Sequence, residues 1–164
     1  MPRPMELHAR LHSREATTAT ASVQVLARWL VTAEAGEPEA GSLTNTASAA
    51  RVFDKLSQRV ALLITQVGSE ALLSRAVHLA RSEVPFLAEV QGVASKDAVI
   101  DRLRVAAASA QPSQADAGLV VVLGTLVALL ESFIGSDLTF RLLRDLWPEL
   151  PVMATQRSPA DAQS

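Results

Sequence analysis

The feature that most constrains the fold is an uncharged apolar run at residues 117–130, AGLVVVLGTLVALL, which lies between Asp116 and Glu131. A helix that spans a membrane needs about 20 apolar residues, whereas runs of about 10–14 are more typical of buried core helices. We therefore expect a central apolar helix at residues 118–134, buried inside a helical bundle. A membrane-associated helix in the same place is the less favoured alternative.

Composition limits the class of protein further. The chain has 164 residues, 49% apolar and 20% charged, which suits a single globular domain. Its net charge of −2 disfavours a basic nucleic-acid surface or a polybasic membrane anchor. It has no cysteine, so disulfides, thiolate metal sites and thiol nucleophiles are excluded. Its first residues contain no apolar segment typical of a secretory signal, and we expect a cytoplasmic protein.

Apolar residues at steps of three and four predict further helices at residues 22–34, 46–67, 69–84 and 95–109, and a last helix after Gly135. Leu63 and Val67 are expected to face the core from the second of these helices, and Leu138 from the last. Gly68 is predicted to end the second helix and join it to the third as a hairpin. Four serines are predicted to cap helices, and these are Ser69, Ser95, Ser113 and Ser136.

Glycine, proline and polar residues, which interrupt helices, set the expected domain limits. Residues 1–21 are predicted to form a mobile arm, residues 36–44 a linker, residues 111–115 a loop and residues 151–164 a disordered tail. One domain then occupies residues 22–150. The fold class is all-α, a compact helical bundle of about five to six helices.

Two segments also carry a resemblance. Residues 70–87 read EALLSRAVHLARSEVPFL, and residues 126–150 read LVALLESFIGSDLTFRLLRDLWPEL. They resemble a group of small all-helical bacterial proteins of unknown function, in which an EVPxL segment precedes FIGxxLTxRLLRxxWP. The matching positions include Glu83, Val84, Pro85, Leu87, Phe133, Ile134, Gly135, Leu138, Thr139, Arg141, Leu142, Leu143, Arg144, Trp147 and Pro148. The likeness covers residues 47–150 and implies a shared bundle and a bacterial source, but no activity.

Glu131 is the one charged residue between Asp116 and Asp137. A buried carboxylate costs several kcal/mol, of order 3–5, unless it is paired. Arg141 and Arg144 follow the turn at Gly135 and could fold back on it. The favoured interpretation is a solvated or salt-bridged carboxylate at the rim of the bundle. The alternatives are a ligand pocket around Glu131, Arg141 and Arg144, or a homotypic interface.

The large aromatic residues Trp29 and Trp147 suit either core packing or the anchoring of a partner. His8 and His12 lie four residues apart, as metal ligands on a helix can, and His78 has neighbouring arginines. Solvent-exposed histidines are nevertheless the favoured interpretation for all three. The sequence lacks the usual nucleophile, phosphate-binding and zinc motifs, and a helix-turn-helix at Gly68 lacks the usual turn.

We therefore expect no enzyme, no cofactor, no metal site and no nucleic-acid partner. The predicted function is a protein–protein interaction module, either a homo-oligomer or an adaptor of a bacterial cytoplasmic complex, acting through apolar helix faces. The alternative is a ligand-sensing or catalytic bundle with its pocket around Glu131, Arg141 and Arg144.

Overall fold

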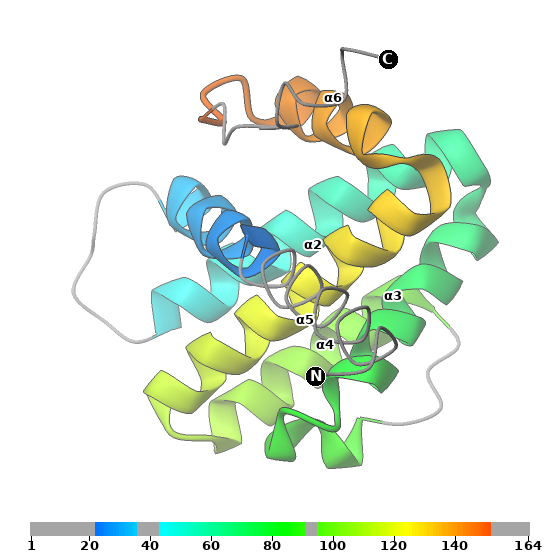
Figure 1. Ribbon diagram of the computed structural model, residues 1–164. Helices are drawn as coiled ribbons and strands as arrows, with labels where there is room; N and C mark the ends of the chain where they lie inside the picture. Colours follow the sequence, from blue (N-terminus) through cyan, green and yellow to red (C-terminus); the bar gives the residue numbers. More distant parts are fainter. Residues whose placement is uncertain (1–21, 36–42, 91–94, 152–164) are drawn as a thin grey trace, which may run out of the picture.

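A computed structural model describes residues 22–35, 43–90 and 95–151, and all regular secondary structure in these ranges is helical (Figure 1). A first helix occupies residues 22–35. The elements that follow are α2 (Leu43–Ile64), α3 (Gln66–Ala80), the short 3₁₀ helix η1 (Pro85–Glu89), α4 (Lys96–Ser109), α5 (Pro112–Ile134) and α6 (Ser136–Leu146). This confirms the expected all-α bundle. The predicted arm, most of the predicted linker and nearly all of the predicted tail lie outside the described residues.

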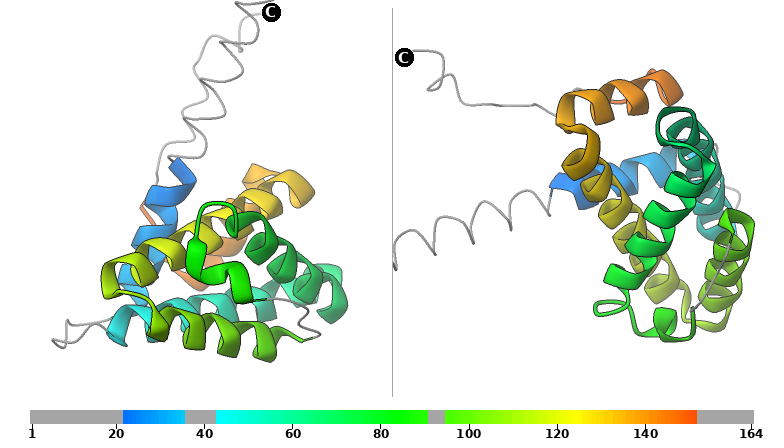
Figure 2. Two further views of the ribbon diagram at one scale, coloured as in Figure 1. Left: turned by 90° about the horizontal axis from the view of Figure 1, so that it is seen from below. Right: turned by 90° about the vertical axis from the view of Figure 1, so that its right-hand side faces the viewer.

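The apolar helix α5 lies at the centre of the bundle and packs against α2, α3, α4 and α6 (Figures 1 and 2). Its side chains Leu123, Val127 and Leu130 are completely buried. The first helix crosses it closely at Gly124, where an added Cβ would lie 3.1 Å from Nε2 of Gln24. The small residue at this crossing therefore allows the two backbones to approach.

The central helix is longer than the sequence predicted. It begins at Pro112, so the expected loop at residues 111–115 is wrong. Proline is well placed at the first position of a helix, because its fixed φ is helical and the N–H it lacks would have no intrahelical partner. The predicted linker at residues 36–44 is also too long, since α2 begins at Leu43.

Of the four serines predicted to cap helices, only Ser95 does so, accepting a hydrogen bond from the Ala98 N–H at the start of α4. Ser69 is buried within α3, and its hydroxyl donates to the Ser57 carbonyl of α2 at 2.9 Å. Ser113 lies inside α5, and Ser136 begins α6 without a side-chain cap. Packing between helices, rather than capping, explains the most buried of these serines.

The joint between the second and third helices also differs from the prediction. It falls at Thr65, whereas Gly68 lies inside α3. Thr65 has a positive φ of 82°, the only such value outside glycine in the described residues. Leu63, Val67 and Leu138, which were expected to face the core, are exposed. The shift of the joint explains the error at Val67, which lies on α3 and not on α2. Leu63 stays on α2, in a last turn that also exposes Leu62.

Candidate functional site

Two sharp joints, which we call elbows, organise one end of the molecule. The first elbow is Thr65, between α2 and α3, and the second is Gly135, between α5 and α6. Their backbone angles are nearly identical, with φ 82° and ψ 160° at Thr65 and φ 86° and ψ 154° at Gly135. Figures 1 and 2 show both elbows at the same end of the bundle. The two helix pairs are therefore bent in the same way.

The hydrogen bonds around the two elbows match as well. At the first, the Thr65 N–H donates to the Ala61 carbonyl and the Ser69 N–H donates to the Thr65 carbonyl. At the second, the Gly135 N–H donates to the Glu131 carbonyl and the Thr139 N–H donates to the Gly135 carbonyl. In each case the hydroxyl residue four positions after the elbow is buried. The helical hydrogen bonds thus run up to each elbow residue and start again from its carbonyl.

Exposed apolar side chains lie within three residues of these elbows along the chain. Leu62 is 77% exposed, Val67 76% and Phe133 65%, and Leu63 and Leu138 are also exposed. These five residues, which we call the elbow face, are most of the eight large hydrophobic residues that are exposed in the described part of the chain. Scattered apolar side chains are normal on a protein surface, but a group of them marks a site of interaction.

The polar residues that the sequence predicted as a possible pocket, Glu131, Arg141 and Arg144, do not contact one another through hydrogen bonds or ion pairs among the described residues. Glu131 is half-buried, and burial raises the pKa of its carboxyl. Arg141 and Arg144 are exposed, and within the described residues no hydrogen bond or ion pair connects either of them to Glu131. Of the two forms of the favoured interpretation, a solvated or a salt-bridged carboxylate, the salt bridge to Arg141 or Arg144 is not formed among the described residues.

Trp147 is buried and makes a polar contact that the sequence did not indicate. Its Nε1–H donates to Oε1 of Glu34 at 2.8 Å, and Nζ of Lys55 lies 2.5 Å from the same oxygen. Burial alone would raise the pKa of Glu34, but the hydrogen bonds from Lys55 and Trp147 and the positive charges of Lys55 and Arg51 outweigh it and lower that pKa. This contact ties the first helix, α2 and the end of α6 together, so Trp147 belongs to the fold. Trp29 is half-buried and packs against the core.

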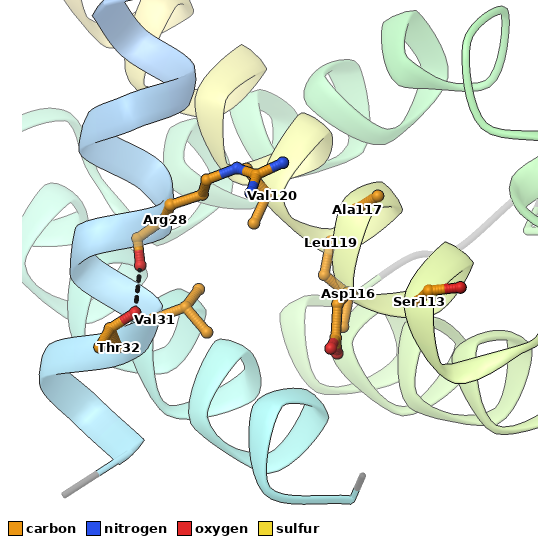
Figure 3. Close-up of a pocket in the computed structure, with 8 residues that line it drawn as sticks. All are labelled: Arg28, Val31, Thr32, Ser113, Asp116, Ala117, Leu119 and Val120. Atoms are coloured by element: carbon orange, nitrogen blue, oxygen red, sulfur yellow. Dashed lines mark hydrogen bonds between the residues drawn. The ribbon is translucent and has the colours of Figure 1, made fainter.

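A cleft of about 330 Å³ separates the first helix from the start of α5. Figure 3 shows Arg28 and Thr32 on one wall and Ser113 and Asp116 on the other. This volume lies at the lower end of the range of small-molecule sites, roughly 300–1,000 Å³. None of the candidate site residues predicted from the sequence lines this cleft.

A broader groove lies between α2 and α4 and carries charges of both signs. Asp54 lies beside it and forms an ion pair with Lys96. The hydrogen bond between them lowers the pKa of Asp54 and raises that of Lys96. Since each charge stabilises the other, this pair fixes α4 on α2 and offers no poised acid or base.

Of the three histidines, the structure describes only His78. His8 and His12 lie outside the described residues, and His78 is exposed on α3. Across the described ranges, no cluster of three histidine, aspartate or glutamate side chains could hold a metal ion.

One described helix, α5, is long and apolar enough to cross a membrane, and half of its most apolar window is buried in the bundle. A core helix of a soluble protein meets the same criteria.

Comparison with protein-family models, with curated proteins and with solved structures finds no match to this chain.

Proposed function

We propose that this chain is a non-enzymatic protein–protein interaction module of a bacterial cytoplasmic assembly, and that it binds through the elbow face. The observation that carries the proposal is the exposure of Leu62, Leu63, Val67, Phe133 and Leu138 beside the two elbows. Large apolar side chains gathered at one end of a bundle are costly in water and gain free energy when a partner covers them. The bacterial source rests on the resemblance of residues 70–87 and 126–150 alone.

The size of the effect indicates what kind of complex this surface supports. Full burial of one such side chain contributes about 1.5–3 kcal/mol, so five partly exposed ones contribute on the order of 5 kcal/mol. Association costs roughly 4–15 kcal/mol in lost translational and rotational freedom. The elbow face alone therefore supports weak association, and a stable complex needs further contacts.

A ligand-binding bundle is the competing function, and its proposed pocket has less support. Glu131 makes no hydrogen bond or ion pair with Arg141 or Arg144 among the described residues. The only change that the surroundings make to Glu131 is a raised pKa, caused by burial. A partly buried acid at the edge of an apolar surface is equally consistent with an interface.

The test is site-specific photo-cross-linking from the elbow face. Val67 and Val105 are matched, since both are valines on helices and are 76% and 71% exposed, and Val105 lies on α4 away from the elbows. Each is replaced in turn by benzoylphenylalanine in cells that naturally express the chain. We expect a cross-linked species of one defined mass from position 67 and none from position 105. No cross-link from position 67, or the same products from both positions, would refute the proposal.

A further inference from the structure

The backbone of the first elbow is strained, and a change to helical angles at Thr65 would relieve the strain. The backbone of Thr65 lies in a region of positive φ that is essentially restricted to glycine, and threonine is β-branched as well. Both neighbours of Thr65 are already helical, and residues 43–80 contain no proline. If Thr65 adopted helical angles, α2 and α3 would become one continuous helix, and the strain would disappear.

The elbow divides the molecule into two parts that hold each other through polar contacts. Residues 22–64 lie before it and residues 66–151 after it. The bonds that connect the described residues of the two parts include Arg59 to Asp145 at 3.0 Å, the Trp147 indole to Glu34 at 2.8 Å, Lys96 to Asp54, and the Ser69 hydroxyl to the Ser57 carbonyl at 2.9 Å. The apolar contacts of α2 with α3, α4, α5 and α6 also cross this division. All of these contacts can form again between two chains that open at the same residue.

We propose that the partner of the elbow face is a second copy of this chain, and that the two copies exchange residues 22–64 by straightening at Thr65. This inference rests on the proposed function and names its partner. Each half of the dimer then has the packing of the bundle described above, with the first helix and α2 supplied by the other copy. Short joints under strain favour such exchange, because opening relieves the strain while the packing is preserved.

The exposed residues of α2 and α3 fit this arrangement. Leu63 and Val67 lie four residues apart, so on a continuous helix they stack on one face. The straightened helices of the two copies meet at the joint, where this face of each can cover that of the other. The contacts of α2 are the same in two closed monomers and in the exchanged dimer, so they cancel. The free energy that favours the dimer comes from relief of the strain at both Thr65 residues and from the covering of Leu63 and Val67.

The second elbow does not share the strain. Gly135 adopts the same angles without cost, because glycine has no Cβ and tolerates positive φ. Nothing lies within 4 Å of the place that a Cβ would occupy there. Exchange is therefore expected at Thr65 and not at Gly135, so α6 stays on its own chain.

Cysteine cross-linking tests the exchange directly, because the chain contains no cysteine of its own. The pair Arg59→Cys with Asp145→Cys lies across the division, at two exposed side chains. The control pair, Arg104→Cys with Asp101→Cys, lies within α4. Monomer and dimer fractions are separated by gel filtration, treated with a short bismaleimide and run on denaturing gels.

We expect the isolated dimer to give covalent dimers from the 59/145 pair and only internal cross-links from the control pair. The isolated monomer gives internal cross-links from both. Internal cross-links from the 59/145 pair in the dimer mean that two closed copies dock without exchange. That result overturns the exchange and leaves the proposed function standing. A chain that stays monomeric at millimolar concentration also overturns it, while the photo-cross-links decide the proposed function separately.

Variants of the joint give an independent measurement. Thr65→Gly removes the strain of the closed form in both copies, so we expect the dimer association constant to fall at least about tenfold. Thr65→Ala keeps a Cβ at the strained position and strengthens the helix, so the dimer is expected to persist. Sedimentation velocity over a concentration series measures both. An unchanged constant for Thr65→Gly would contradict exchange at this residue.

Discussion

The two elbows of this bundle have the same geometry and different residues. Thr65 and Gly135 share their backbone angles within a few degrees, and each is followed by a buried hydroxyl, Ser69 or Thr139. The Ser69 hydroxyl bonds to a neighbouring helix, while the Thr139 hydroxyl donates to the Gly135 carbonyl of its own elbow. The difference shows that packing can force a bend on a residue that does not favour it. The type of residue at the bend then determines how much conformational strain the bend introduces.

The largest effect is expected when the unstrained elbow is given a side chain. In Gly135→Ala the new methyl group meets no atom within 4 Å, so the whole penalty comes from the backbone at φ 86°. We expect the free energy of unfolding to fall by about 2 kcal/mol, measured by urea denaturation.

A second glycine provides the matched control for that measurement. Gly68 is helical within α3, and an added Cβ would lie at an ordinary distance of 3.4 Å from Ile64. Gly68→Ala should therefore stabilise the protein by about 0.5–1 kcal/mol, since alanine favours a helix more than glycine does. If Gly68→Ala lost as much as Gly135→Ala, the joint would lie at Gly68 after all.

A smaller effect of opposite sign is expected at the strained elbow. Thr65→Gly removes strain worth about 1–3 kcal/mol. It also loses the hydrogen bond that the Thr65 hydroxyl accepts from the Gly68 N–H, and it makes the unfolded chain more flexible. The net gain in the free energy of unfolding is expected to be about 1 kcal/mol, measured on the monomer. A loss of stability would mean that the threonine hydroxyl matters more than the backbone strain.

The same comparison shows how far the sequence predicts the fold. The helical class, the central helix and the elbow at Gly135 follow from apolar spacing and from glycine, because local preference and packing agree there. At the first elbow they disagree. Gly68 was the obvious place to end a helix, but packing of Ser69 and Leu73 places the bend at Thr65. A signal was nevertheless present, since Ile64, Ser69 and Leu73 have the same spacing as Ile134, Thr139 and Leu143.

The candidate site was less predictable for the same reason. Leu63 and Val67 continue the apolar spacing of α2, but the bend places Val67 on α3, and Leu63 lies in the exposed last turn of α2. Of the candidate site residues predicted from the sequence, Glu131 lies one helical turn before Gly135. The contact of Trp147 with Glu34 joins residues too far apart in sequence for any local pattern to reveal it.

The smallest effect concerns the carboxyl group beside the second elbow. Glu131 occupies the position that Ala61 occupies at the first elbow, because each carbonyl accepts the N–H of its elbow residue. Burial raises the pKa of Glu131, so the folded state favours the protonated form. The protonated Glu131 carboxyl therefore contributes fully to the free energy of unfolding at low pH, and this contribution is lost as the pH rises through the raised pKa.

Glu131→Gln should accordingly raise the free energy of unfolding at pH 7 by about 0.5 kcal/mol and leave it unchanged near pH 4. Glu34→Gln is the control of opposite sign, because hydrogen bonds and positive charge lower the pKa of Glu34 despite its burial. At pH 7 that variant should have a lower free energy of unfolding than the unchanged chain. The difference should shrink as the pH falls through the lowered pKa of Glu34. Urea denaturation between about pH 3 and pH 7 measures both. If Glu131→Gln instead destabilised the protein at pH 7, the ionised carboxylate would have a favourable partner within the chain, and burial would not dominate its surroundings.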